Sequence, residues 1–232
     1  MSAITLCDVA PRDGLQNRPG VIEPSVRAEL VDRLATTGLP RVEAVSFVSP
    51  SRVPQMAGAE EVVSAIMPHA GVAVAGLVLN ERGYDRLVAA DLREAHFSFA
   101  VSEEFNRRNQ GASVEESLAA ATSIIERARG DDVAVSVTLS TAFGCPFEGK
   151  VDPGRVTDIA ARVVDAGPDE VLLADTIGVA VPRQVGALVT DVGRLGLPVG
   201  VHLHNFQLHV QVFRHPARVG QVVRVAVFPP AH

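Results

Sequence analysis

The sequence has few cysteines, no excess of basic residues and no long apolar run, and each shortage excludes a class of protein. Cys7 and Cys145 are the two cysteines in 232 residues, so neither a disulfide framework nor a CxxC zinc site is expected. The formal net charge of −6 lacks the basic excess of a nucleic-acid-binding protein. No apolar run approaches the roughly 18 residues of a membrane span, and no charged-then-apolar signal opens the chain. We therefore expect a cytoplasmic protein with no nucleic-acid or membrane partner.

The apolar residues, 47% of the chain, are arranged in short runs that alternate with helical patterns. The expected strands span residues 3–7, 41–48, 72–79, 96–101, 133–140, 170–174 and 198–203, and the expected helices span 24–37, 58–67, 80–90, 113–129, 153–166 and 182–194. Near-continuous apolar strands are typical of parallel strands that are buried on both faces. Because no dinucleotide-binding glycine fingerprint is present, the alternation favours a single α/β domain of the (β/α)8 TIM-barrel class over a Rossmann sheet.

Polar clusters follow the ends of the expected strands, where TIM barrels place their active sites. Arg12 and Asp13 lie in a polar stretch after the first strand, which either forms a solvated turn or contributes to an active site. His202 and His204 are two residues apart on the last expected strand, so both side chains leave the same face. They are either ordinary core or surface histidines or ligands of a divalent metal. In the second case Asp13 is the natural third ligand, and the mixed nitrogen and oxygen set suits Mg, Mn or Zn.

Three further side chains are candidates for chemistry. Arg12 offers a fixed fork of hydrogen-bond donors that suits a developing oxyanion or enolate. Glu43 lies inside an apolar strand, where an unpaired carboxylate is costly, so it either forms a salt bridge with an arginine or orients Arg12. Asp175 either caps the turn that follows its strand or belongs to the active site.

Seven motifs together resemble hydroxymethylglutaryl-CoA lyase. They are Arg12–Asn17 (RDGLQN), Val42–Pro50 (VEAVSFVSP), Val53–Met56 (VPQM), Leu79–Tyr84 (LNERGY), Gly144–Gly149 (GCPFEG), Asp175–Gly178 (DTIG) and His202–Asn205 (HLHN). The resemblance runs in register from about residue 4 to residue 205. Leu15 stands where the related acyl-transferring synthases carry a glutamate, which favours the lyases.

The resemblance implies cleavage of 3-hydroxy-3-methylglutaryl-CoA to acetoacetate and acetyl-CoA by a retro-Claisen or aldol reaction that a divalent metal assists. It implies that Asp13, His202 and His204 bind the metal, which would be Mg or Mn. It also implies that His202 is a catalytic residue. It further implies a small acyl-CoA as the substrate and leaves a homodimer open. A related acyl-CoA aldolase or synthase, and a non-catalytic product, are the alternatives.

The same resemblance assigns roles to five more side chains around the metal ligands. Arg12 would face the thioester oxygen and Glu43 would support Arg12. Asp175 would lie in the substrate site as a catalytic residue. Gln16 and Ser46 would lie near the substrate as binding residues.

The family pattern ends after Asn205. Lyases of this family continue with a further helix, an eighth strand and a glycine-rich loop that carries a catalytic cysteine, and Cys145 lies in a different segment. No acidic residue follows Asp191. We therefore expect a lyase domain over residues 1–205, with strands one to seven, and a non-family tail over residues 206–232 that arose from a shifted reading frame or from divergence.

This ending has consequences for the expected barrel. The barrel would be incomplete at its C-terminal side, with two open strand edges, weak metal binding and little turnover. A strand within residues 221–228 is compatible with the β-branched content there, but it is disfavoured because no convincing helix precedes it.

Overall fold

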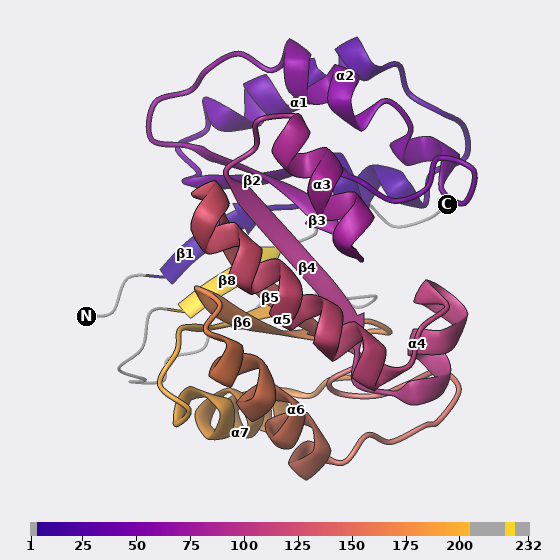
Figure 1. Ribbon diagram of the computed structural model, residues 1–232, viewed down its shortest axis with the longest axis vertical. Helices are drawn as coiled ribbons and strands as arrows, with labels where there is room; N and C mark the ends of the chain where they lie inside the picture. Colours follow the sequence, from indigo (N-terminus) through magenta and orange to yellow (C-terminus); the bar gives the residue numbers. More distant parts are fainter. Residues whose placement is uncertain (1–3, 205–220, 226–232) are drawn as a thin grey trace.

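A computed structural model of the chain describes residues 4–204 and the backbone of residues 221–225, and it confirms the TIM-barrel class (Figure 1). Eight parallel strands form a closed barrel in chain order. The strands are β1 (Ile4–Asp8), β2 (Arg41–Ser46), β3 (Ala73–Val78), β4 (Glu94–Ala100), β5 (Ala134–Ser140), β6 (Glu170–Asp175), β7 (Val199–Leu203) and β8 (Gln221–Val225).

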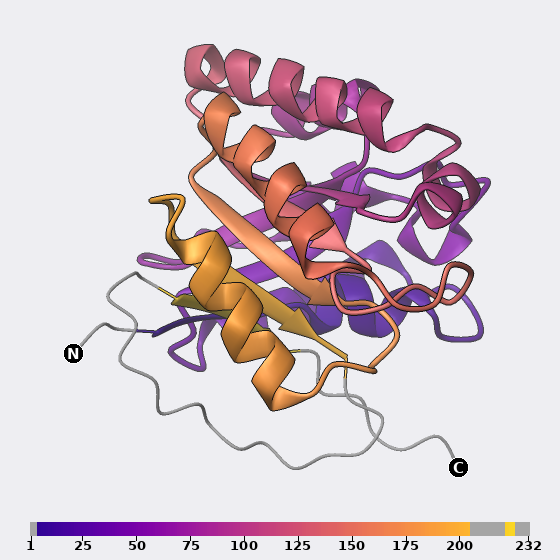
Figure 2. The same ribbon diagram turned by 90° about the horizontal axis from the view of Figure 1, so that it is seen from below.

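Helices lie on the outside of the strands, as Figure 2 shows for the side that carries the last of them. They are α1 (Pro24–Ala35), α2 (Ala59–Ala65), α3 (Glu81–Ala89), α4 (Glu103–Gln110), α5 (Val114–Asp131), α6 (Pro153–Ala166) and α7 (Pro182–Gly193), with two short turns, η1 (Ala10–Gly14) and η2 (Pro54–Met56). The apolar core fills the layer between strands and helices. Val42 and Val137 from the strands and Ile124 from α5 are examples of fully buried members.

The strand β8 corrects one expectation from the sequence. Gln221–Val225 pairs in parallel with β1 from Ile4 to Asp8 and with β7 from Val201 to Leu203. The edges of β1 and β7, which were expected to be open, are therefore both paired with β8. The β-branched residues of this segment favour the extended backbone that pairing with β1 and β7 requires. The rest of the expected tail, residues 205–220 and 226–232, lies outside the described residues.

The barrel interior is unusually polar for this class. TIM barrels fill their interior mainly with branched apolar side chains. Here ionisable side chains from three strands occupy it, with Glu43 of β2 and His96 of β4 fully buried and Glu170 of β6 at 5% exposure. Within the described residues no helix is long and apolar enough to cross a membrane.

The start of α5 shows how local sequence sets an element. Ser113 Oγ accepts a hydrogen bond from the Glu116 backbone N–H at 3.1 Å, and Glu116 Oε2 accepts one from the Ser113 backbone N–H at 2.7 Å. This is the reciprocal capping box that the Ser-x-x-Glu spacing indicates. Both bonds satisfy backbone donors that the first helical turn otherwise leaves without partners.

Replacing Ser113 by alanine is expected to lower the free energy of unfolding by about 1 kcal/mol, because one capping acceptor is lost. Urea unfolding followed by circular dichroism measures this. The control is Ser64→Ala in α2, where the hydroxyl only donates to the Glu61 carbonyl and the change is expected to stay within about 0.5 kcal/mol. Equal effects of the two substitutions would contradict a capping role for Ser113.

Candidate metal centre and active site

The polar stretch after β1 forms the first half of the site. The chain leaves β1 through η1, a π-helical turn in which the Gly14 backbone N–H donates to the Val9 carbonyl, five residues earlier, at 3.4 Å. Such wide turns occur often at functional sites because they redirect side chains out of the regular helical path. Arg12 is 8% exposed and Asp13 is 5% exposed. The stretch is therefore not the solvated turn that was one of the two alternatives.

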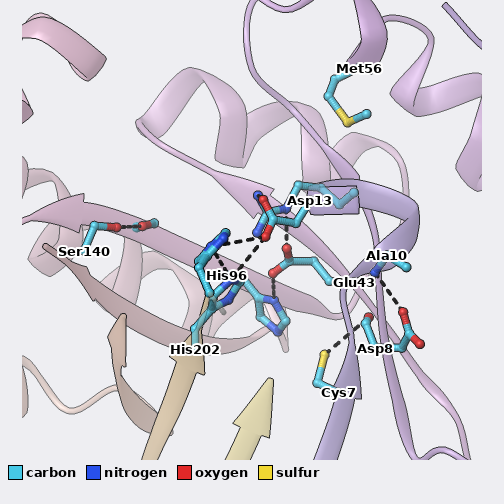
Figure 3. Close-up of polar contacts among 12 residues, drawn as sticks. Cys7, Asp8, Ala10, Asp13, Glu43, Met56, His96, Ser140 and His202 are labelled. Carbon is cyan, nitrogen blue, oxygen red and sulfur yellow. Dashed lines mark hydrogen bonds and ion pairs between the residues drawn. The ribbon is translucent and has the colours of Figure 1, made fainter. Parts of the chain in front are cut away.

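His202 and His204 bring the second half of the site from the end of β7. The Asp13 Oδ2 atom lies 3.2 Å from His202 Nε2 and 3.4 Å from His204 Nε2. The two Nε2 atoms are 3.0 Å apart, and the imidazole rings stack with their centroids 4.8 Å apart. Figure 3 shows the side chains of Asp13 and His202 directed toward each other. The three residues thus form a group that could hold a metal ion.

The spacing of these three atoms fits a metal centre. Ligand atoms that share a face of an octahedron about 2.1 Å from its centre lie about 3.0 Å apart, and those of a tetrahedron of that radius lie about 3.4 Å apart. The observed separations of 3.0, 3.2 and 3.4 Å fall in this interval. One carboxylate and two imidazoles are suitable donors for a divalent cation.

The protonation states favour ligation. Burial opposes ionisation of Asp13, but the neighbouring Arg12 charge and the His202 hydrogen bond outweigh it and lower the pKa of the carboxyl to about 2. Burial and the adjacent His202 lower the pKa of His204 below its ordinary value, which favours the neutral imidazole that binds metals. A deprotonated carboxylate and a neutral imidazole are the forms that metal binding needs.

Arg12 is held by two carboxylates. Its Nε donates to Glu43 Oε1, and its Nη1 lies 3.1 Å from Asp13 Oδ1. Burial opposes the charge on Arg12, yet the Glu43 and Asp13 carboxylates outweigh this and raise its pKa. The two alternatives for Glu43 therefore coincide, because the arginine that forms the salt bridge is Arg12 itself.

Asp175, at the end of β6, accepts two backbone hydrogen bonds. Its Oδ1 takes the Val179 N–H and its Oδ2 takes the Ala180 N–H, both at 2.9 Å. These bonds are the capping arrangement that the sequence analysis considered. A catalytic role for Asp175 therefore stays a prediction.

Ser46 and Gln16, the two side chains predicted to lie near a substrate, share an unusual property. Ser46 Oγ and Gln16 Oε1 are buried atoms that have no hydrogen-bond partner within the described part of the chain. Buried polar atoms in folded proteins are nearly always paired, so an unpaired one needs an explanation. A bound polar ligand is one such explanation.

Sequence reasoning missed His96. This histidine was assigned only to an apolar strand, yet its ring is fully buried between Glu43 Oε2 at Nδ1 and Glu94 Oε1 at Nε2. The spacing of Glu94 and His96 was a usable clue, because two ionisable residues two apart on a buried strand point to the same side.

A closed α/β barrel with a carboxylate and two imidazoles at the C-terminal ends of its strands, next to a buried arginine, has the architecture of a metal-dependent TIM-barrel enzyme. The comparison with known families agrees with that class. The chain belongs to the HMGL-like family, whose model matches residues 3–207.

Relatives of known name are similar over most of this chain. The (R)-citramalyl-CoA lyase of Chloroflexus aurantiacus is 43% identical over 217 residues, which cover 88% of this chain and 68% of the relative. The mitochondrial hydroxymethylglutaryl-CoA lyase of Mus musculus is 38% identical over 205 residues, which cover 87% of this chain and 63% of the relative. The chain thus spans about two thirds of the length of these relatives.

Solved structures show the same similarity. The hydroxymethylglutaryl-CoA lyase of Pseudomonas aeruginosa superposes with a TM-score of 0.80 at 38% identity, covering 88% of this chain and 68% of that one. An HMG-CoA lyase of Acinetobacter baumannii in complex with coenzyme A and 3-methylmalate gives a TM-score of 0.85 at 34% identity, covering 89% of this chain and 70% of that one.

Proposed function

We propose that residues 1–205 of this chain form a lyase domain that uses a divalent metal, Mg or Mn, to cleave a carbon–carbon bond in a 3-hydroxyacyl-CoA. The observation that carries the proposal is the convergence of Asp13, His202 and His204 beside the buried Arg12. The family match over residues 3–207 and the names of the relatives support it.

The residues of the chain have separate tasks in this proposal. Asp13, His202 and His204 hold the cation, which when bound supplies a Lewis acid for the hydroxyl and carboxylate oxygens of the substrate. Arg12 presents its guanidinium to the thioester oxygen, where negative charge develops as the acetyl-CoA enolate leaves. Glu43 fixes the direction of Arg12 through the Nε hydrogen bond.

Three further side chains would shape the substrate site. Ser46 Oγ and Gln16 Oε1 are buried without partners in the described residues, and a polar substrate atom would satisfy them. The Asp175 carboxylate is fixed by the Val179 and Ala180 N–H groups, so it can act in the site without rearranging.

The first candidate substrate is 3-hydroxy-3-methylglutaryl-CoA, which yields acetoacetate and acetyl-CoA. The 43% identity to an (R)-citramalyl-CoA lyase favours (R)-citramalyl-CoA as the second candidate. The two thioesters differ by one methylene beside the distal carboxylate, and both release acetyl-CoA. One methylene changes binding by only about 1–3 kcal/mol, so a substrate panel is needed to separate the two candidates.

The test is an assay of acetyl-CoA formation by the full chain with Mn²⁺ and each thioester in turn. We expect slow release of acetyl-CoA from one of them and complete loss of it with EDTA. Acetoacetate as the second product would identify the first candidate, and pyruvate would identify the second. Unchanged thioesters in the presence of bound Mn²⁺ would contradict the lyase and leave a metal-binding domain.

A further inference from the structure

We propose that His96 is a positioning residue for Arg12. Its ring contacts the Glu43 oxygen that Arg12 does not bind. The ring also connects the Arg12–Glu43 pair to further ion pairs in the barrel interior. The part of this inference that concerns catalysis rests on the proposed function, whereas the part that concerns the buried network does not.

The first step is the geometry of the ring. His96 is fully buried, and its Nδ1 meets Glu43 Oε2 (Figure 3). Its Nε2 lies 2.9 Å from Glu94 Oε1. A neutral imidazole has one N–H donor and one lone pair, whereas an ionised carboxylate only accepts. Two carboxylates that face both ring nitrogens are satisfied together when the ring carries both protons. This geometry favours a ring that carries a proton on both nitrogens, between Glu43 and Glu94.

The second step is the continuation beyond Glu94. Arg41 Nε lies 2.7 Å from Glu94 Oε1, and Arg41 Nη1 lies 2.7 Å from Glu170 Oε1. Within the described residues, basic and acidic side chains thus alternate along one series of contacts, in the order Arg12, Glu43, His96, Glu94, Arg41 and Glu170. Alternation lets each buried charge face a neighbour of opposite sign, which is the condition under which buried ion pairs persist.

The third step is the effect on Arg12. Oε1 of the Glu43 carboxylate accepts a hydrogen bond from Arg12, and Oε2 contacts the His96 ring. The carboxylate plane is therefore fixed, and with it the direction of the guanidinium whose Nε it holds. Without His96, Glu43 would lose the partner that holds its Oε2 atom, and Arg12 would lose the rigid support that an oxyanion-stabilising group needs.

The direct test is nitrogen NMR of the full chain labelled with ¹⁵N-histidine at neutral pH. The His96 signals are assigned by their loss in His96→Gln. We expect both ring nitrogens of His96 to show the chemical shift of protonated nitrogen. A shift typical of an unprotonated nitrogen at either position would overturn the proposal, whether or not the chain cleaves any thioester.

The second measurement separates positioning from structural support. In His96→Gln we expect kcat for the cleaved thioester to fall about 10- to 100-fold, as is typical for residues that orient a catalytic group, with KM within about threefold. Mn²⁺ affinity should stay within about twofold, because the nitrogens of His96 face Glu43 and Glu94 and none of the three metal-ligand candidates.

The matched control is Ser98→Ala, two residues further along β4. The Ser98 hydroxyl lies 2.9 Å from Ser140 Oγ and takes no part in the ion network, so kcat should stay unchanged. An equal loss of kcat in both variants, or a fall in Mn²⁺ affinity as large as the fall in kcat, would contradict a positioning role for His96. A chain without lyase activity would refute the proposed function alone and would leave the NMR result decisive for the network.

Discussion

Replacing Asp13 by asparagine is expected to weaken Mn²⁺ binding at least about 100-fold. Loss of a residue that only supports a metal ligand typically weakens metal binding about 10- to 100-fold. Asp13 is proposed as a ligand itself, so its loss should have a larger effect. The substitution keeps the shape of the side chain and removes its negative charge. His202 and His204 alone would leave two imidazoles, 3.0 Å apart at their Nε2 atoms, near the positive charge of Arg12. Isothermal titration with Mn²⁺ measures the change.

A suitable control for the metal experiment is Asp8→Asn. Asp8 lies at the end of β1, five residues before Asp13, and its Oδ1 accepts the Ala10 backbone N–H at 2.8 Å. The substitution removes the same charge from the same segment without touching the candidate ligands. We expect Mn²⁺ affinity within about threefold of the parent, since Asp8 is none of the candidate ligands and dissolved ions screen the charge of its partly exposed side chain. Equal weakening by both substitutions would show that net charge, not ligation, governs binding.

Replacing Glu43 by alanine is expected to lower the free energy of unfolding by about 3–5 kcal/mol, which is the usual consequence of removing one partner from a buried ion pair. Glu43 has no exposed side-chain surface and lies between the side chains of Arg12 and His96. Its removal leaves two buried groups that face an apolar methyl instead of a carboxylate. Urea unfolding gives the value, and total stability of about 5–15 kcal/mol makes a loss of this size easy to detect.

The control for the stability experiment is Glu29→Ala on α1. Glu29 forms a 2.6 Å ion pair with Arg33, but both side chains are more than half exposed, at 59% and 76%. An exposed pair of this kind contributes about 0–1 kcal/mol. If Glu43→Ala and Glu29→Ala destabilised the protein equally, the interior network would contribute no more than surface ion pairs do.

The sequence was sufficient for those features that depend on neighbours along the chain. Apolar runs that alternate with helical patterns predicted the barrel class, and the predicted helix over residues 113–129 begins at Ser113, where the Ser-x-x-Glu spacing allows a capping box. His202 and His204 were expected on one face because side chains alternate along a strand, and their stacked rings confirm that expectation.

Other features could not be predicted because they depend on which strands become neighbours. Residues Gln221–Val225 were disfavoured as a strand on the sequence that precedes them, yet their extended backbone pairs with both β1 and β7. The spacing of Glu94 and His96 indicated a shared side of β4, but the sequence could not show that Glu43 of β2 would meet the same ring.

The sequence by itself therefore determined the fold class, the family motifs and the residue types available for chemistry. The tertiary structure alone decided which of them meet. Asp13 and His202 are 189 positions apart in the chain but 3.2 Å apart in the barrel. The physical reason is that local propensity acts over a few residues, whereas barrel closure sets distances between segments that are remote in sequence, and a metal site or an ion network exists only at those distances.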